Sequence, residues 1–288
     1  RSILRRFKIV NFTEQVYGAN NKKQIILEVI NPEKQKKHLV LRGEYCELDF
    51  LVNDIIHIIN TDEGNPNLID DTHNLLVLNP DILVPATKIA QQVNCPRKTV
   101  LVSRYRFPGT TSVPIIVGEI VHFIFQECMV TETWDLDFMR EVFDNLKEQY
   151  LLNLYSIDKD MDDVDQEVEK HFPYLQEWFD SYYKKTANTR SKIEDCLERD
   201  LISFAVEDIL DIEEEIRSPV FGLKGMIDAT IIASLQNKST NGKFLLPMEI
   251  KTGREHVSHS AQASLYALLF KDRYDMEIDS FILVYTKL

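Results

Sequence analysis

The stretch GLKGMIDATIIASLQNKSTNGKFLLPMEIKTG, residues 222–253, is the most informative part of the chain for its architecture. It contains two apolar runs, Met226–Leu235, which is rich in β-branched residues, and Lys243–Thr252, which carries Phe244, two leucines and Ile250. The polar segment Asn237–Gly242 between them has the composition of a turn. The pattern predicts a β-hairpin.

Each run of this hairpin also carries charge. Residues two apart in a strand share a face, so Glu249 and Lys251 should lie side by side with Ile250 toward the core, and Asp228 should come alongside from the partner strand. Charges inside apolar strands are costly unless they are paired or bound to a metal ion. Asp228, Glu249 and the Ile250 carbonyl offer the oxygen ligands that Mg²⁺ or Mn²⁺ prefers.

Lys251 would then orient or deprotonate a water molecule, or neutralise charge on a phosphate. A surface hairpin with an ordinary cross-strand salt bridge is the alternative interpretation.

Composition places the chain among ordinary globular proteins. Its 288 residues, 44% hydrophobic and 27% charged, can bury one large core or two smaller ones. No apolar run was expected to reach the roughly 18–20 residues that span a bilayer, and no signal peptide is recognisable, so we expect a soluble intracellular protein. The net charge of −13 argues against coating nucleic acid by bulk charge but leaves room for a local basic channel.

The four cysteines, Cys46, Cys95, Cys128 and Cys196, are widely spaced and form no CxxC pair. They predict neither a disulfide framework nor a complete zinc site. By residue type alone, Cys95 is most simply a free buried cysteine.

Short β-type runs separated by polar turns occupy the N-terminal part. They are FKIVNF, IILEVI, HLVLRG, DIIHIIN and NLLVLNP. Five such runs predict a small barrel or sandwich over residues 1–84. A barrel of the OB type would be a platform for nucleic acid, and a purely structural barrel fits the pattern equally well.

Helical periodicity dominates after residue 85. We expect helices at Ala86–Arg104 (interrupted at Cys95-Pro96), Val113–Val130, Trp134–Leu154, Asp163–Tyr183 and Ser258–Lys271, a loop at Ala187–Asp200 and a final strand at Ser280–Lys287. With the hairpin, this order predicts a mixed α/β sheet that has the hairpin near its middle.

Two pairs of residues stand out on these helices, each pair spaced one helical turn apart. Gly118 precedes His122 by four residues, so it would let another backbone or a ligand approach the imidazole. Gln262 and Tyr266 share a face of a later helix in the same way. A single histidine on a buried helix is either a metal ligand or a hydrogen-bonded core residue, and the residues alone leave both open.

Four motifs in order, Gly118-x-x-x-His122, Gly225-x-Ile-Asp228, Glu249-x-Lys251-Thr-Gly and Gln262-x-x-x-Tyr266, resemble those of RecB-type nucleases in the PD-(D/E)xK superfamily. Longer segments of the sequence resemble one family within this superfamily more closely. FGLKGMIDATI, LPMEIKTGRE, GEIVHFIFQ and IAQQVNCPRKTVL resemble the nuclease portion of the eukaryotic DNA replication ATP-dependent helicase/nuclease family, and the resemblance covers nearly the whole chain.

The resemblance implies an OB-like β-barrel over residues 1–84 and, over residues 85–288, a restriction-endonuclease-like mixed sheet flanked by helices and shortened at its C-terminal end. It implies these site residues: His122, Asp228, Glu249 and the Ile250 carbonyl as metal ligands, Lys251 as the catalytic lysine, and Gln262 and Tyr266 as residues that position DNA or support the metal site. Cys95 matches the first of four cysteines that hold a [4Fe–4S] cluster, and the other three have no match in this chain.

The implied activity is Mg²⁺- or Mn²⁺-dependent hydrolysis of single-stranded DNA and flaps, in Okazaki fragment processing and in resection of double-strand breaks. Implied partners are that DNA, a single-stranded DNA-binding protein and a 5′–3′ ATP-dependent helicase portion of the same polypeptide, in the nucleus and, as a second location, the mitochondrion. Arg97, Arg104 and Tyr105 are candidates for lining a single-strand channel. A catalytically inactive DNA-binding or scaffold module is the alternative.

Overall fold

The structure is a computed structural model that describes residues 3–60, 64–105, 111–183, 192–194, 201–236 and 241–286. The chain forms two compact units, one made of Arg1–Pro85 and Arg217–Lys224, the other of Ala86–Ile216 and Gly225–Leu288. The short segment Arg217–Lys224 thus groups with the N-terminal residues although its neighbours in sequence belong to the second unit.

The first unit is a mainly antiparallel sheet. Its elements are β1 (Ile3–Tyr17), β2 (Lys22–Ile30), β3 (Lys36–Leu41), the 3₁₀ helix η1 (Gly43–Glu47), β4 (Ile55–Asn60), β5 (Leu68–Ile69) and β6 (Leu75–Leu78). The strand order is β5-β3-β2-β1-β4-β6, so the expected short strands are confirmed. A closed barrel is not, because β5 and β6 end the order and do not pair with each other among the described residues.

Alternation explains how this sheet buries its core. Along β2, Ile25, Leu27 and Val29 are buried while the residues between them are partly exposed. Period-2 patterning of this kind places one face of a strand on the core. The strand β1 is long enough to pair with β4 through its first half and with β2 through most of its length.

The segment Arg217–Lys224 is attached to this unit by backbone contacts. Leu223 and Lys224 pair in parallel with β7 (Val84–Pro85), and the Val220 carbonyl lies 3.2 Å from His57 Nδ1. Gly222 has φ +64°, and a Cβ there would lie 3.3 Å from the Pro80 Cα. Both the backbone conformation and the close approach favour glycine at this position.

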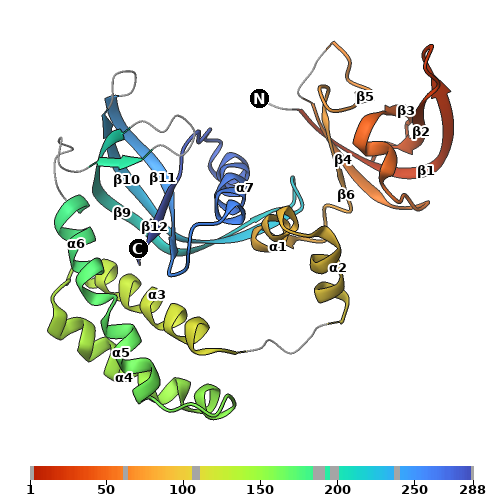
Figure 1. The fold of residues 1–288 in the computed structure, drawn as a ribbon. Helices are drawn as coiled ribbons and strands as arrows, with labels where there is room; N and C mark the ends of the chain where they lie inside the picture. Colours follow the sequence, from red (N-terminus) through yellow and green to blue (C-terminus); the bar gives the residue numbers. More distant parts are fainter. Residues whose placement is uncertain are drawn as a thin grey trace. The chain divides into compact units, whose positions relative to one another are not determined.

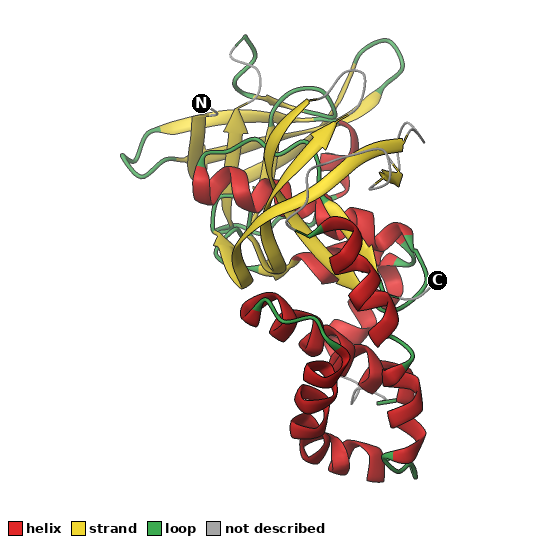
Figure 2. Cartoon of the chain, turned by 90° about the vertical axis from the view of Figure 1, so that its left-hand side faces the viewer, coloured by secondary structure: helices red, strands yellow, loops and turns green. Residues whose placement is uncertain are grey.

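The second unit is a sheet flanked by helices (Figures 1 and 2). Its elements are α1 (Ala86–Ala90), the 3₁₀ helix η2 (Gln91–Val93), α2 (Pro96–Tyr105), α3 (Val113–Thr131), α4 (Leu136–Tyr155), α5 (Asp162–Glu169), α6 (Phe172–Tyr182), β8 (Lys192–Glu194), β9 (Leu201–Ser218), β10 (Leu223–Gln236), β11 (Asn241–Lys251), α7 (Val257–Tyr274) and β12 (Ile282–Tyr285). The order β12-β11-β10-β9-β8 puts the predicted hairpin strands, β10 and β11, in the interior of the sheet. The sheet is mixed, since β10 and β11 are antiparallel and β11 and β12 are parallel.

Two expectations need correction. The predicted helix Asp163–Tyr183 is divided into α5 and α6, because Pro173 at the start of α6 has no backbone N–H with which to continue an upstream helix. The predicted loop Ala187–Asp200 includes the short strand β8, and the rest of that range lies outside the described residues, as do four residues of the hairpin turn.

The two faces of the hairpin differ in chemistry. Met248 and Ile250 belong to the apolar core that also holds residues of α3, α4, α5 and α6. Glu249, between them, faces the opposite side and contacts α7. The hairpin therefore presents an apolar face to α3 and a charged position to α7, as the alternation in the sequence predicts.

Helix α3 is more apolar than the sequence analysis allowed. It is 19 residues long with a hydropathy of 1.6, which is long and apolar enough to cross a membrane by length and composition alone. Core helices of soluble proteins pass the same test, and half of this helix is buried. Its residues Ile116, Ile120 and Ile124 are fully buried in the core of the second unit.

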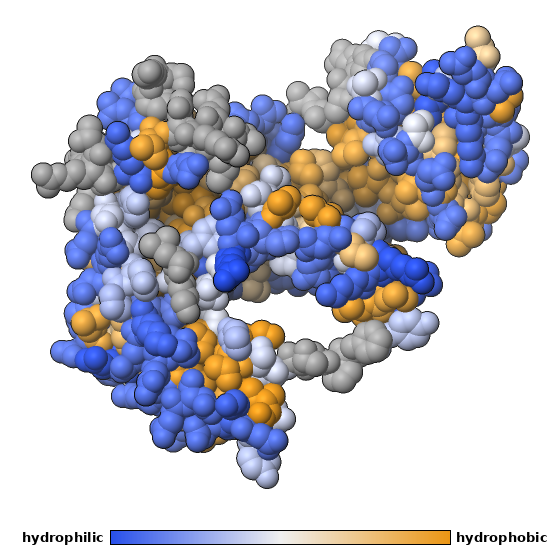
Figure 3. Space-filling model, in the orientation of Figure 1, coloured by the Kyte–Doolittle hydropathy of each residue, from blue (hydrophilic) through white to orange (hydrophobic). Residues whose placement is uncertain are grey.

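Some apolar side chains remain on the surface, as Figure 3 shows in the region of α2 and of α3 and α4. Helix α2 has no buried residue, and its Val100, Leu101 and Tyr105 are exposed.

Candidate active site

The ends of β10 and β11 bring the predicted charged residues together. The Ile250 backbone N–H donates to Asp228 Oδ2 at 2.6 Å, and Lys251 Nζ lies 2.5 Å from Glu249 Oε1. The Glu249 side chain is only 4% exposed, against 23% for Lys251. The side-by-side placement predicted from residue spacing is therefore found, and Ile250 is buried as expected. The interpretation as a surface hairpin is wrong, because Asp228 and Glu249 are both buried.

Helix α7 holds Glu249 from the other side. Gln262 Nε2 donates to Glu249 Oε1 at 2.6 Å, and Tyr266 Oη donates to Glu249 Oε2 at 3.0 Å. Lys251 Nζ also reaches Gln262 Oε1 at 3.4 Å. Burial and the neighbouring Glu249 charge raise the pKa of Tyr266, so it stays a neutral donor. Both oxygens of this carboxylate are thus fixed by buried neutral side chains.

The close packing of α7 on β10 depends on Gly225. A Cβ at this position would lie 2.7 Å from Leu269 Cδ1 and 2.9 Å from Tyr266 Cε1. Its absence allows Tyr266 Oη to reach both Glu249 and the Met226 carbonyl, the latter at 2.8 Å. The Gly225-x-Ile-Asp228 motif therefore begins with glycine because any side chain there would clash with α7.

Helix α3 supplies His122. Its Nε2 lies 3.0 Å from Asp228 Oδ2, with the side chain 26% exposed. Burial alone would lower the pKa of His122, but the hydrogen bond and charge of Asp228, together with Glu213 and Glu249, outweigh it and raise that pKa. His122 therefore faces the carboxylates and is not simply a residue of the apolar core.

On the same helix, Gly118 makes room for a side chain at the end of β11, whereas the sequence predicted that it would let a backbone or a ligand approach the imidazole. A Cβ there would lie 2.8 Å from the Thr252 Oγ1, directly after β11. The missing side chain lets α3 approach the end of the strand that carries Glu249 and Lys251.

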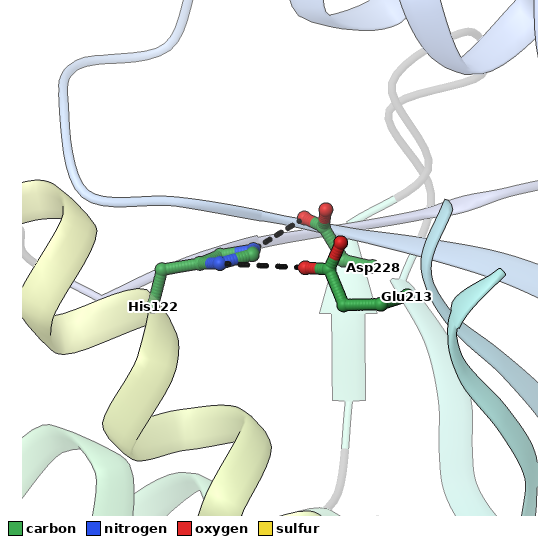
Figure 4. A group of neighbouring side chains, drawn as sticks. All are labelled: His122, Glu213 and Asp228. Carbon is green, nitrogen blue, oxygen red and sulfur yellow. Dashed lines mark ion pairs between the residues drawn. The ribbon is translucent and has the colours of Figure 1, made fainter. Parts of the chain in front are cut away.

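Glu213 also belongs to this group, although no motif in the sequence predicts it. His122 Nδ1 lies 3.9 Å from Glu213 Oε1, so the two ring nitrogens face two different carboxylates (Figure 4). One ligand atom each from His122, Glu213 and Asp228 lie within 4.8 Å of one another. Glu213 lies in a run of three glutamates on β9, where nothing in the sequence distinguishes it from its neighbours.

A pocket of about 460 Å³ opens onto these groups. It is lined by Pro114, Ile115, Gly118, Glu119, His122, Asp228, Glu249, Ile250, Lys251 and Thr252. The pocket combines one apolar edge from the start of α3 with the charged ends of the hairpin strands. A polar ligand can therefore reach the buried carboxylates from solvent.

The balance of charge in the pocket favours a cation. Burial and the neighbouring Asp228 raise the pKa of Glu249, although the Lys251 ammonium opposes the shift. Two close carboxylates repel each other, and a divalent ion would relieve this repulsion. The carboxylate oxygens are donors suited to Mg²⁺ or Mn²⁺, and the imidazole nitrogen is a further donor beside them.

Other candidate residues lie outside this group. Arg97, Arg104 and Tyr105 are exposed on α2 and do not line the pocket. Cys95 is a free, exposed cysteine just before α2, so the expectation that it is buried is wrong. Of the remaining cysteines, Cys46 and Cys128 are free and buried, and Cys196 lies outside the described residues.

The fold and the pocket define a mixed α/β protein with a buried carboxylate, imidazole and lysine site of a composition suited to divalent cations. Residues 30–233 match the family described as DNA replication factor Dna2. The chain belongs to this family, and it corresponds to the family's nuclease portion.

Curated relatives agree with this assignment. The chain is 34% identical to the DNA replication ATP-dependent helicase/nuclease of Schizosaccharomyces pombe, over 86% of its own length and 17% of the relative's. For the Saccharomyces cerevisiae protein of the same description the identity is 31%, covering 92% and 18%. For that of Homo sapiens it is 28%, covering 91% and 26%. The chain therefore spans only about a sixth to a quarter of the length of these relatives.

Proposed function

We propose that this chain is a divalent-metal-dependent nuclease that hydrolyses single-stranded DNA and DNA flaps. The observation that carries the proposal is the buried Glu249, which lies beside Asp228 and an ammonium group at the floor of a solvent-open pocket. Two neighbouring buried carboxylates cost stability even with the polar partners found here, and such an arrangement is typical of functional sites. We place the second unit in the PD-(D/E)xK superfamily on the order of its four motifs.

In this proposal Asp228, Glu249, His122 and the Ile250 carbonyl hold Mg²⁺ or Mn²⁺. When bound, the ion supplies Lewis-acid polarisation of the phosphate and lowers the pKa of water. Asp228 is already oriented for this role, because its Oδ2 accepts a hydrogen bond from the Ile250 N–H.

Lys251 is the residue that faces the substrate. Its ammonium is partly exposed in the pocket, where it can orient the attacking water or stabilise the extra negative charge that develops on the phosphate. Gln262 and Tyr266 are buried behind Glu249 and bond to both of its oxygens. We therefore assign them to support of the metal-binding carboxylate and not to direct contact with DNA.

The test uses isosteric variants. Asp228→Asn keeps an acceptor for the Ile250 N–H, and Glu249→Gln keeps the shape of the side chain, so both should fold. With a labelled 5′ or 3′ flap and Mg²⁺ or Mn²⁺, each variant should lose cleavage by about a thousandfold or more. Asp211→Asn removes a carboxylate elsewhere on β9 and should cleave as the unchanged chain does. Full activity of Asp228→Asn or Glu249→Gln would refute the site.

The alternative function is an inactive DNA-binding or scaffold module. It predicts that affinity for single-stranded DNA survives chelation by EDTA and that no product accumulates with either metal ion. A nuclease with a single-strand path should instead shorten the flap and largely spare a blunt duplex. Equal digestion of flap and blunt duplex would contradict the choice of substrate.

The description of the relatives as DNA replication ATP-dependent helicase/nucleases, together with the resemblance of the sequence motifs, leads to a wider proposal. We propose that the chain acts within a longer helicase/nuclease that moves 5′ to 3′, in Okazaki fragment processing and in resection of double-strand breaks, with a single-stranded DNA-binding protein as partner. The proposed location is the nucleus and also the mitochondrion. Imaging of the tagged full-length protein, together with flap cleavage in the presence of the single-stranded DNA-binding protein, would test these points.

We also propose that Cys95 is one of four thiolate ligands of a [4Fe–4S] cluster in the longer protein. Its exposure just before α2 leaves the thiol accessible to such ligation. A cluster of this kind needs four thiolates, so this chain alone should bind none stably. Anaerobic purification of the longer protein with and without Cys95→Ala, followed by iron analysis, tests the assignment, and equal iron in both would exclude Cys95.

A further inference from the structure

We propose that Glu213 is a positioning residue that fixes the ring of His122 for metal binding by accepting the proton on Nδ1. The inference rests on the proposed metal-dependent nuclease function and adds to it a residue that none of the four motifs contains. In this proposal Glu213 contacts the imidazole of His122 and does not bind the ion.

The geometry gives each ring nitrogen its own carboxylate. Nε2 lies 3.0 Å from Asp228 Oδ2, within the site of the two buried carboxylates. Nδ1 lies 3.9 Å from Glu213 Oε1, on another edge of the ring (Figure 4). The ring is thus held between β10 and β9, which carry Asp228 and Glu213.

The chemistry of imidazole makes the second carboxylate useful. A histidine nitrogen binds a metal ion only without its proton, so a neutral ring that binds through Nε2 must carry its proton on Nδ1. That N–H needs an acceptor, and carboxylates commonly fill this role beside metal-binding histidines. Glu213 is the carboxylate that faces Nδ1.

Glu213 is itself held in place by the helix that carries His122. Gln126 follows His122 by four residues on α3, is buried, and donates from Nε2 to Glu213 Oε1. Residues four apart on a helix lie one above the other, so Gln126 brings Glu213 to the level of the imidazole. The backbone of Glu213 has φ +57°, which interrupts the regular path of β9 at this residue.

The present distance of 3.9 Å is longer than a hydrogen bond. A shift of about 1 Å in one side chain would bring it into the range of 2.7–3.2 Å typical of N–H to O bonds. Glu213 is also 38% exposed, whereas Asp228 is 10% exposed. The more exposed carboxylate has the freedom to adjust to the ring, while the buried one is fixed by the strand.

The first experiment locates the proton. The whole chain is labelled with ¹⁵N-histidine, and long-range ¹H–¹⁵N correlation spectra are recorded with saturating Mg²⁺, which is diamagnetic. We expect His122 to show a protonated Nδ1 and an unprotonated Nε2, with the Nδ1 signal altered in Glu213→Ala. A proton on Nε2 in the presence of Mg²⁺ would overturn the proposal, as would evidence that Nδ1 or Glu213 binds the ion directly.

The second experiment measures Mn²⁺ affinity by calorimetry, with no DNA present. Loss of an acceptor behind a metal-binding histidine typically weakens metal affinity about 10–100-fold. We expect a loss of this size in Glu213→Ala, a smaller loss in Gln126→Leu, and partial recovery in Glu213→Gln, whose amide oxygen still accepts the Nδ1 proton. Asp211→Asn removes a negative charge from the same strand away from His122 and should change affinity less than about twofold.

Asp228→Asn distinguishes a failure of the role proposed for Glu213 from a failure of the proposed metal site. If it loses Mn²⁺ binding while Glu213→Ala binds as tightly as the unchanged chain, the metal site stands and the role of Glu213 is wrong. If Asp228→Asn also binds normally, the proposed metal site itself fails. If Glu213→Gln is no better than Glu213→Ala, the hydrogen-bonding role is overturned in favour of simple charge.

Discussion

The two sheets of this protein bury different kinds of side chain. Among the described residues, the sheet of the first unit buries an apolar core with a few neutral polar residues, such as His57 and Asn60, and no carboxylate. The sheet of the second unit buries Asp228 and Glu249 next to an equally apolar core. Side chains alternate between two faces in both sheets. The sheets differ because the central strands of the second one also carry buried carboxylates, at Asp228 and Glu249.

The buried carboxylates of the second unit are a feature that stability alone does not explain. Burying two like charges a short distance apart costs free energy that an apolar or neutral pair would not cost. Such a cost persists where the arrangement serves a function. The comparison therefore supports, independently of any motif, the proposal that the second sheet carries the chemistry.

The largest expected effect is on catalysis in the second unit. Lys251→Met should slow single-turnover cleavage of a flap by about 10²–10³-fold, because a preorganised positive group that stabilises developing charge is lost. Mn²⁺ binding should remain, since no ligand is removed. Lys243→Met is the matched control on the same strand, where the lysine is 69% exposed and pairs with Glu207. Equal rates for the two variants would show that Lys251 takes no part in the proposed chemistry of the second sheet.

A cavity in the first unit should have the next largest effect. Leu27 is fully buried in the middle of β2, and Leu27→Ala should lower the free energy of unfolding by about 2–5 kcal/mol. Chemical denaturation followed by circular dichroism measures the loss. Val16→Ala, at a residue that is 68% exposed on β1, should change little. Similar losses in both variants would show that this sheet is not organised around the proposed core.

Packing behind the charged site can be disturbed without touching a charge. Gly225→Ala places a methyl group against Leu269 and Tyr266, so we expect a loss of about 1–3 kcal/mol and a displaced Tyr266. Flap cleavage should fall with it, because Tyr266 no longer holds Glu249. Gly253→Ala meets nothing within 4 Å and should be close to neutral. Unchanged stability of Gly225→Ala would contradict the steric reason given for this glycine.

The smallest effects concern pH, and one carboxylate from each unit should respond in opposite ways. Burial alone would raise the pKa of Asp70, but hydrogen bonds from His73 and Thr72 outweigh it and lower that pKa. Its stabilisation is present above the unfolded pKa of about 3.9 and is lost as the pH falls below it. Asp70→Asn should therefore destabilise the chain at pH 7, by about 1 kcal/mol, and the difference should close in acid.

Glu249 has a raised pKa in the folded chain, so the sign is reversed. Protonated Glu249 favours the folded state, and that stability is lost as the pH rises through the folded pKa. In EDTA at pH 7, Glu249→Gln should be as stable as the unchanged chain or more stable, and the difference should shrink as the pH falls. Thermal denaturation between pH 4 and pH 8 checks both variants. If Glu249→Gln were less stable than the unchanged chain at pH 7, the predicted contrast between Asp70 and Glu249 would be wrong.

Much of this architecture was predictable from the sequence because it depends on local patterns. Apolar β-type runs placed the main strands of the first unit and the β10–β11 hairpin but not β8, helical periodicity placed α3 and α7, and spacing placed Glu249 beside Lys251. The division between α5 and α6 was missed because the apolar stripe continues across Pro173. Closure of the first sheet was not confirmed, since strand pairing at its edges depends on long-range contacts that no local pattern encodes.

At the candidate site, the sequence predicted the residues that belong to motifs and not those that depend on the path of the chain. Asp228, Glu249, Lys251, Gln262 and Tyr266 were found because each belongs to a motif with its own spacing. Glu213 was missed because its role depends on which of three adjacent glutamates the path of β9 turns toward His122. Cys95 was expected to be buried from residue type, but the break at Cys95-Pro96 puts it on the surface before α2.

The attachment of Arg217–Lys224 to the first unit affects the order in which the protein can be completed during synthesis. The Val220 carbonyl that faces His57 lies 163 residues further along the chain. At translation rates of about 5–20 residues per second, those residues emerge roughly 8–30 s after His57. The nascent N-terminal sheet must wait that long with His57 Nδ1 lacking this partner, although Arg6 already contacts Nε2 at 3.0 Å, which makes it a candidate client for chaperones until the second unit is nearly complete.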